Sequence, residues 1–220
     1  MSTDQASGPG PQDRYSTWTG KARGWLLRRL PPEKLLPEDQ PSYVASWIYV
    51  FGMGAIAALV WVVASGIILG LNGPLWYHTS GLGHFVNSTH LWGVELFFMF
   101  MVIHLWGKFW MAAWRGGRAL TWITGMIAFV ASIVTAFTGY LLQTNFDSQW
   151  IAFQAKDALN AVGVGAWFKV SDIGQVFTWH VTLMPLALGA VIALHVVLVR
   201  VHGVVPPLEA AESDAQLERP

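Results

Sequence analysis

Three long stretches of this sequence contain no Lys, Arg, Asp or Glu: residues 40–94, 119–146 and 173–199. A helix that crosses a bilayer needs about 20 mostly apolar residues, and charged side chains are costly in hydrocarbon. The first stretch holds one span over residues 44–71 and the start of a second helix over roughly 87–114. With one span in each of the other stretches, the sequence predicts an all-α membrane protein with a four-transmembrane-helix bundle.

The chain divides into four parts. Residues 1–13 are polar and rich in Gly and Pro, which predicts a disordered tail, and residues 208–220 predict a flexible acidic tail. Residues 14–40 interleave Trp and Leu with Lys and Arg, which favours an N-terminal amphipathic interfacial helix; the alternative is a solvated basic tail with one apolar patch. Residues 41–207 form the predicted four-helix domain.

Basic residues predict the orientation of the bundle. Six Lys or Arg precede the first span, Lys108, Arg115 and Arg118 flank the second loop, and the first loop, over residues 72–86, has none. Because cytoplasmic loops carry an excess of basic residues, both termini are expected to be cytoplasmic. We therefore expect a multi-pass protein of a prokaryotic cytoplasmic membrane.

Composition excludes several classes of protein. The net charge is zero, so a nucleic-acid partner is not indicated. The chain has no cysteine, which excludes disulfides, iron–sulfur ligation by this chain and thioether-linked haem.

Two histidine pairs lie within the apolar stretches. His90 and His104 are 14 residues apart, and His180 and His195 are 15 apart. On a helix these spacings are about 21 and 22 Å, with each pair near one face. The second and fourth spans run in the same direction, so the histidines fall at two membrane depths: an outer level with His90 and His180, and an inner level with His104 and His195. Neutral imidazole is an axial ligand of haem iron; the alternative role is a hydrogen bond between helices.

Four glycines repeat this spacing on the first and third spans. Gly52 and Gly66 are 14 residues apart, and so are Gly125 and Gly139. Glycine lets a bulky group approach the backbone, so these positions are candidates for haem packing. Helix–helix packing is the alternative.

These features together resemble the N-terminal, haem-binding half of cytochrome b, most of all cytochrome b6 of b6f-type quinol-oxidising complexes. The resemblance covers about residues 15–207. Further matching elements are the segment Ala136-Phe-Thr-Gly-Tyr-Leu141, Pro185, Arg200 with Gly203, and Pro206-Pro207.

The resemblance implies a transmembrane electron-transfer subunit that is not active alone. Its cofactors would be two non-covalent b-type haems, with quinone and quinol at its two sides. Electrons would pass from an outer quinol site through the two haems to an inner quinone site. Implied partners are a three-helix C-terminal cytochrome b half, a Rieske iron–sulfur protein, a cytochrome c and membrane lipid, in a homodimeric complex.

The resemblance also implies roles for individual residues. The inner haem propionates or quinone would be near Arg200, His202, Lys108, Arg115 and Arg118, for which interfacial anchoring is the alternative. Tyr140 is the outer quinol-site candidate.

The sequence departs from the family pattern on the outer side. Asn87 and Gln175 stand where the family has arginines for the outer propionates, and residues 141–147 replace its Pro-Trp motif. These departures favour a second hypothesis, a dihaem membrane anchor that links the quinone pool to a peripheral dehydrogenase or reductase. A third hypothesis is a haem-free structural or transport subunit. Glu95 is expected to point away from His90.

Overall fold

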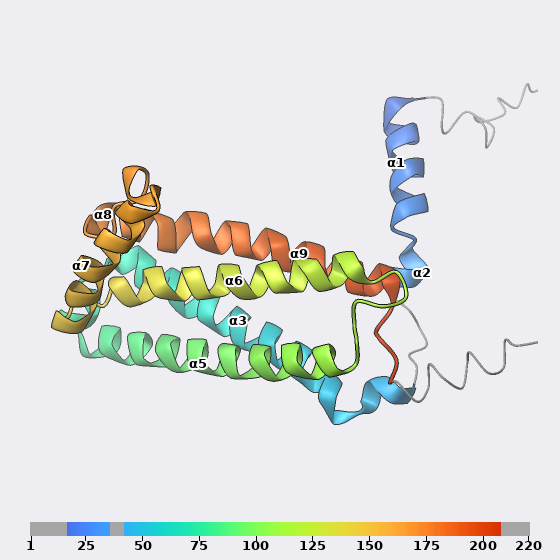
Figure 1. Ribbon diagram of the computed structural model, residues 1–220, viewed down its shortest axis with the longest axis horizontal. Helices are drawn as coiled ribbons and strands as arrows, with labels where there is room; N and C mark the ends of the chain where they lie inside the picture. Colours follow the sequence, from blue (N-terminus) through green and yellow to red (C-terminus); the bar gives the residue numbers. More distant parts are fainter. Residues whose placement is uncertain (1–16, 36–41, 208–220) are drawn as a thin grey trace, which may run out of the picture.

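A computed structural model describes residues 17–35 and 42–207, and the regular secondary structure of this part is entirely helical. The tails expected over residues 1–13 and 208–220 lie outside the described residues. Four helical segments are long and apolar enough to cross a membrane, which confirms the predicted four-helix membrane fold (Figure 1). They are α3 (Trp47–Asn72), α5 (Gly81–Trp110), α6 (Ala119–Leu141) and the continuous segment Ile173–His202.

The fourth segment contains three pieces. Helix α8 (Ile173–Thr178) leads into a π-helical turn, η4 (Trp179–Leu183), and then into α9 (Met184–His202). Pro185 lies in the first turn of α9. Proline has no N–H for the helical ladder, and π-helical turns accommodate one extra residue in a helix.

Several predicted boundaries were wrong. Helix α5 begins at Gly81 rather than residue 87, because the Ser80 side chain accepts a hydrogen bond from the Gly83 N–H (3.2 Å) and caps the helix. His84 is therefore in a helix, and the connection before it contains α4 (Trp76–Thr79). Helix α5 ends at Trp110, not at 114.

The third span also ends earlier than predicted. It stops at Leu141 rather than 146, and Asn145 caps the next helix, α7 (Phe146–Ala161), by accepting from the Ser148 N–H. A short 3₁₀ turn, η3 (Val164–Ala166), follows.

The spans pack as two pairs. Helix α3 packs mainly against α5, and α6 mainly against α9. Gly93 of α5 receives the Trp61 ring of α3, which lets these helices approach closely. Contacts between the pairs include Val181 against Gly70 near one end and the Phe109 and Trp122 rings, 6.4 Å apart, near the other.

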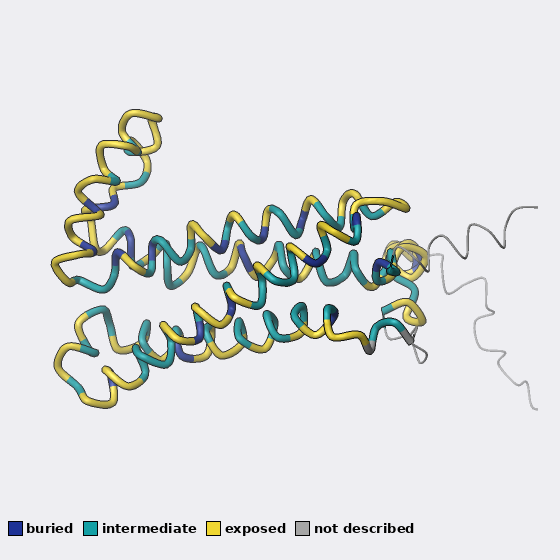
Figure 2. Tube along the Cα trace, turned by 60° about the horizontal axis from the view of Figure 1, so that its bottom comes forward, coloured by how far each residue is buried: buried dark blue, intermediate teal, exposed yellow. Residues whose placement is uncertain are grey.

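The two ends of the bundle differ. Helices α7 and α8 gather at one end (Figure 1), where Leu141, Ala152, Val170 and Val176 form a buried cluster. Much of the remaining helix surface is exposed (Figure 2). In a membrane protein such apolar surface is available to lipid or to other subunits.

Helix α1 (Trp18–Arg29) lies at the opposite end, followed by α2 (Pro32–Leu35). It runs across the long axis of the bundle (Figure 1), and Trp18 is 80% exposed. The predicted N-terminal helix thus exists, while its position on a membrane surface stays a prediction. At the same end the Tyr49 hydroxyl donates to the Val205 carbonyl (2.7 Å) and ties the chain after α9 to the start of α3.

Orientation in the membrane can be tested with single cysteines, since the sequence has none of its own. We expect Ser171→Cys, exposed between η3 and α8, to react with a membrane-impermeant maleimide in intact cells. Arg115→Cys, exposed between α5 and α6, should react only after permeabilisation. The reverse labelling pattern would place both termini outside.

Candidate functional site

The four histidines of the spans each face one of the four spaced glycines. A methyl group built on each glycine would lie 2.5 to 3.1 Å from Cε1 of one imidazole ring. Any larger side chain would therefore displace the ring. The pairs are Gly52 with His104, Gly66 with His90, Gly125 with His195, and Gly139 with His180.

Three of the rings are also held by a hydroxyl group on the facing helix. The Nδ1 atom lies 3.0 Å from Ser65 Oγ for His90, 3.1 Å from Thr138 Oγ1 for His180, and 3.2 Å from Thr124 Oγ1 for His195. Each hydroxyl already donates to a backbone carbonyl of its own helix, at 2.7 to 2.9 Å in its shortest bond. A hydroxyl has one hydrogen, so its oxygen accepts from the imidazole Nδ1–H.

This arrangement fixes the tautomer of the three histidines. With the proton on Nδ1, the Nε2 lone pair is free to bind a metal ion. A hydrogen-bonded second nitrogen is also what orients metal-ligating histidines in proteins. Ser65, Thr124 and Thr138 were not among the site residues predicted from the sequence, although a signal was present: each directly precedes one of the four glycines.

His104 is the exception. Its Nδ1 atom is buried and has no hydrogen-bond partner among the described residues. The residue before its glycine is Phe51, whose ring packs near Trp47 and Phe100 at centroid distances of 5.8 and 6.2 Å.

The π-helical turn reconciles two different spacings. The glycines on α6 are 14 residues apart, whereas His180 and His195 are 15 apart. His180 lies within the turn Trp179–Leu183, which takes up one extra residue. Both rings can therefore meet their glycines on the regular helix α6.

Each level combines one histidine from each helix pair. His90 and His104 belong to α5, whereas His180 belongs to the π-helical turn and His195 to α9. No group of three or more metal-ligating side chains occurs in the described ranges 17–35 and 42–207. Two imidazoles with free Nε2 atoms, facing glycines, suit a haem iron, which takes only two axial ligands from the protein.

The basic candidates near the inner level lie in different surroundings. Lys108 is half-buried, and its Nζ lies 3.7 Å from the centre of the Tyr49 ring. His202 Nδ1 lies 2.7 Å from Thr121 Oγ1, so this histidine links α9 to α6. Arg118 Nε donates to the Gly203 carbonyl (3.3 Å), and Arg115 and Arg200 are exposed.

Hydrogen bonds on the outer side join the connection before α5 to the connection before α7. Tyr77 donates to the Gln143 carbonyl, and His78 Nε2 lies 2.8 Å from Thr144 Oγ1. Burial raises the pKa of the Tyr77 phenol, which favours its protonated, donating form. Gln175 bonds to the backbone of residues 167 and 169. Tyr140, the outer quinol-site candidate, is 37% exposed.

Glu95 lies in the middle of α5 and is exposed, in a different setting from the half-buried His90. Its carboxylate forms no hydrogen bond or ion pair with another residue of the described part.

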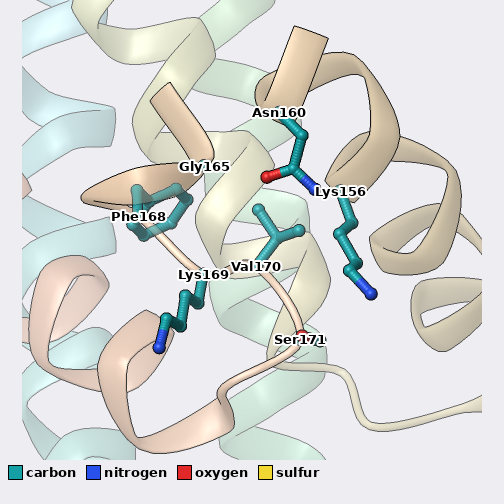
Figure 3. A pocket seen from close by; sticks show the side chains of 7 residues that line it. All are labelled: Lys156, Asn160, Gly165, Phe168, Lys169, Val170 and Ser171. Carbon is teal, nitrogen blue, oxygen red and sulfur yellow. The ribbon is translucent and has the colours of Figure 1, made fainter. Parts of the chain in front are cut away.

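A separate pocket of about 170 Å³ lies beside α7 (Figure 3). Lys156 and Lys169 border it, and Figure 3 shows their amino groups pointing apart. None of the four histidines of the spans lines this pocket.

The fold and the site thus define a four-helix membrane protein with two levels of paired histidines. Comparison with known sequences identifies the family. Residues 95–219, more than half of the chain, match the model of the family described as cytochrome b (N-terminal)/b6/petB. The chain belongs to this family.

Individual relatives agree with this assignment. The chain is 25% identical to the cytochrome b6 of Heliobacterium mobile, over 84% of this chain and 99% of that protein. It is also 25% identical to the cytochrome bc complex cytochrome b subunit of Chlorobaculum thiosulfatiphilum, over 93% of this chain but 54% of that one. Apart from the b6 protein, the chain spans about half the length of these curated relatives.

A solved structure supports the fold. A chain of a hyperthermophilic respiratory Complex III matches with a TM-score of 0.65 and 23% identity, over 84% of this chain and 53% of the other.

The glycine–histidine contacts predict a position-specific effect of one methyl group. We expect Gly139→Ala to lower the free energy of unfolding by roughly 1–3 kcal/mol, because the added carbon would lie 2.5 Å from His180 Cε1. Thermal unfolding in detergent measures this. The matched control is Gly189→Ala on α9, where no atom lies within 4 Å and alanine should be neutral or stabilising. Equal effects at both sites would contradict the steric explanation.

Proposed function

We propose that this protein is the dihaem electron-transfer subunit of a cytochrome bc- or b6f-type quinol-oxidising complex. In this proposal His90 and His180 are the axial ligands of the outer haem, and His104 and His195 those of the inner haem. The observation that carries it is the repeated unit at these levels: an imidazole with its ring against a glycine of the facing helix and, at three of four positions, its Nδ1 bonded to a hydroxyl.

The contribution of the chain is to position and tune, since a haem, when bound, supplies the one-electron redox chemistry. At three of the four histidines a hydroxyl group holds the proton on Nδ1 and leaves the Nε2 lone pair free to bind iron. The apolar spans exclude water from the two levels. Gly52, Gly66, Gly125 and Gly139 make room for the imidazole rings of the proposed ligands, and in this proposal the same clearance would let a flat macrocycle lie close to the facing helices.

The inner side would provide the quinone site and the contacts to propionates. Lys108 is the strongest candidate for a propionate partner, because it is half-buried one helical turn beyond His104. His202 and Arg200 would border the quinone, and His202 would exchange a proton with it. Arg115 and Arg118 would add positive charge, and Tyr140 would lie at the outer quinol site.

The chain would act as part of a larger complex. The partners that we propose are a three-helix C-terminal cytochrome b half, a Rieske iron–sulfur protein and a cytochrome c, in a homodimer within a prokaryotic cytoplasmic membrane. The proposal is supported by the relatives, most of which are about twice as long as the matched region. In such a complex the protein would be part of a quinol:cytochrome c oxidoreductase.

One observation favours a second candidate, a dihaem anchor for a peripheral dehydrogenase or reductase. The segment after Tyr140 lacks the family's Pro-Trp motif, and here Leu141 is only 2% exposed and lies in the cluster with α7. Purification of the native complex separates the candidates. An iron–sulfur signal of Rieske type in electron paramagnetic resonance supports the first, and a dehydrogenase subunit in its place supports the second.

The haem assignment predicts two b-type haems per chain. A pyridine haemochrome assay and a redox-titrated optical spectrum should show two haems with separate midpoint potentials. His90→Ala should remove the outer haem, and His104→Ala the inner one, because each substitution removes one of two axial ligands. His84→Ala, exposed at the start of α5, is the control that should keep both. One haem or none in the unsubstituted protein would refute the assignment.

The position of Lys108 predicts that its substitution will change the midpoint potential of the inner haem only. A nearby positive charge favours the reduced form, so Lys108→Met should lower the inner midpoint potential by the equivalent of roughly a tenfold change in the reduction equilibrium. Redox titration measures it, with the outer haem as internal reference. Arg200→Met, at an exposed position, is a comparison expected to have a smaller effect. An unchanged midpoint potential of the inner haem would contradict the assignment of Lys108 as a propionate partner.

A further inference from the structure

The three hydroxyl-bonded histidines share one register. In each case the hydroxyl belongs to the residue just before the facing glycine, and for His180 and His195 a carbonyl four residues before the glycine also lies near Nδ1. For His180 this carbonyl is that of Thr135, at 3.0 Å, and for His195 it is that of Thr121, also at 3.0 Å. The register therefore defines a recurring acceptor site for an imidazole N–H.

His104 lies in the same register without either acceptor. A methyl group on Gly52 would lie 3.1 Å from His104 Nδ1, as close as the equivalent distances of 3.2 to 3.6 Å at the other three glycines. The ring is thus placed like the others. What differs is the residue before the glycine, since Phe51 offers no hydroxyl, and the Nδ1 atom is left buried and unpartnered.

A hydrogen bond at Nδ1 changes how strongly an imidazole donates charge to a metal through Nε2. When Nδ1–H donates a hydrogen bond, the imidazole becomes a more basic ligand and stabilises the oxidised metal. Without an acceptor, the same imidazole donates less charge, and the reduced form is favoured. At the inner level only His195 has its hydrogen bonds, whereas at the outer level both histidines have them.

We propose that Phe51 is a potential-determining residue of this protein: by denying His104 a hydrogen-bond acceptor, it raises the reduction potential of the inner haem relative to the outer one. Ser65, Thr124 and Thr138 act in the opposite sense, as positioning residues that strengthen their histidines. The inference rests on the proposed function, because it requires haem iron at both levels. The higher potential of the inner haem would make electron transfer from the outer to the inner level energetically downhill, and the residue responsible, Phe51, lies on helix α3.

The test compares Phe51→Thr with Phe51→Val. Both substitutions remove the aromatic ring and have nearly the same shape, and Thr124 and Thr138 show that threonine is accommodated in this register. Only the threonine provides an acceptor for His104 Nδ1–H. Lys108 and all other charges are the same in both variants, so their effects cancel in the comparison.

We expect the inner midpoint potential of Phe51→Thr to lie below that of Phe51→Val by the equivalent of about a tenfold change in the reduction equilibrium, which is about 59 mV for one electron. The outer midpoint should be equal in both variants. The low-spin ferric signal of the inner haem in electron paramagnetic resonance should change between them as well, because the ligand itself has changed. Equal inner potentials and identical signals would overturn the proposal.

A reciprocal variant keeps the test decisive if Phe51→Thr does not fold. Thr138→Val removes one of the two acceptors near His180 Nδ1 and leaves the Thr135 carbonyl, so it should raise the outer midpoint potential by less than the shift at Phe51, while the inner one stays unchanged. An unchanged outer midpoint would overturn the proposal as well.

The number of haems in the unsubstituted protein distinguishes a failure of this inference from a failure of the proposed function. Two haems with unresponsive potentials would refute only the role of Phe51. Fewer than two would refute the dihaem assignment itself.

Discussion

A polar N–H group inside hydrocarbon needs an acceptor, and most of the interior of this bundle follows from that requirement. The four histidines place such groups at two depths, and for three of them the facing helix supplies a hydroxyl group one residue before a glycine. The glycine leaves space for the imidazole ring, and the hydroxyl accepts a hydrogen bond that keeps the imidazole proton on Nδ1. The hydroxyl can do so because its own hydrogen is bonded to the helix backbone, which leaves only its lone pairs for the imidazole.

The second constraint is the residue spacing between the histidines of one helix and the glycines of the facing helix. The two helix pairs meet it in different ways. Helix α3 and helix α5 both repeat their key residues after 14 positions, so two regular helices stay in register. The fourth span needs 15 positions against 14 on α6, and the π-helical turn at His180 takes up the difference. Pro185, in the first turn of α9, has no N–H to donate, so the regular helical hydrogen bonding is already interrupted next to the π-helical turn.

The sequence predicted the four spans and singled out the histidines and glycines that meet in the bundle, because both depend on simple periodicities: uncharged runs of sufficient length and residues repeated on one helix face. It did not predict where α5 begins, since Gly81, Gly83 and His84 have low helix propensity. The Ser80 cap outweighs that propensity. The acceptor role of Ser65 was also missed, because small hydroxyl residues are common in apolar helices and only the contact with His90 distinguishes this one. The π-helical turn was visible only as an extra residue in a spacing, and its meaning depends on the partner helix.

The arrangement of the spans in two pairs has a consequence for assembly. Within each pair the helices are consecutive spans, so each pair can form as a hairpin as the chain enters the membrane. Each level takes one histidine from either hairpin, and the direct contacts between hairpins described above lie near the ends of the bundle. A flat ligand bound at a level would therefore join two hairpins that otherwise hold each other weakly. Such a ligand would therefore add contacts between the hairpins in the middle of the bundle, where the protein itself supplies few.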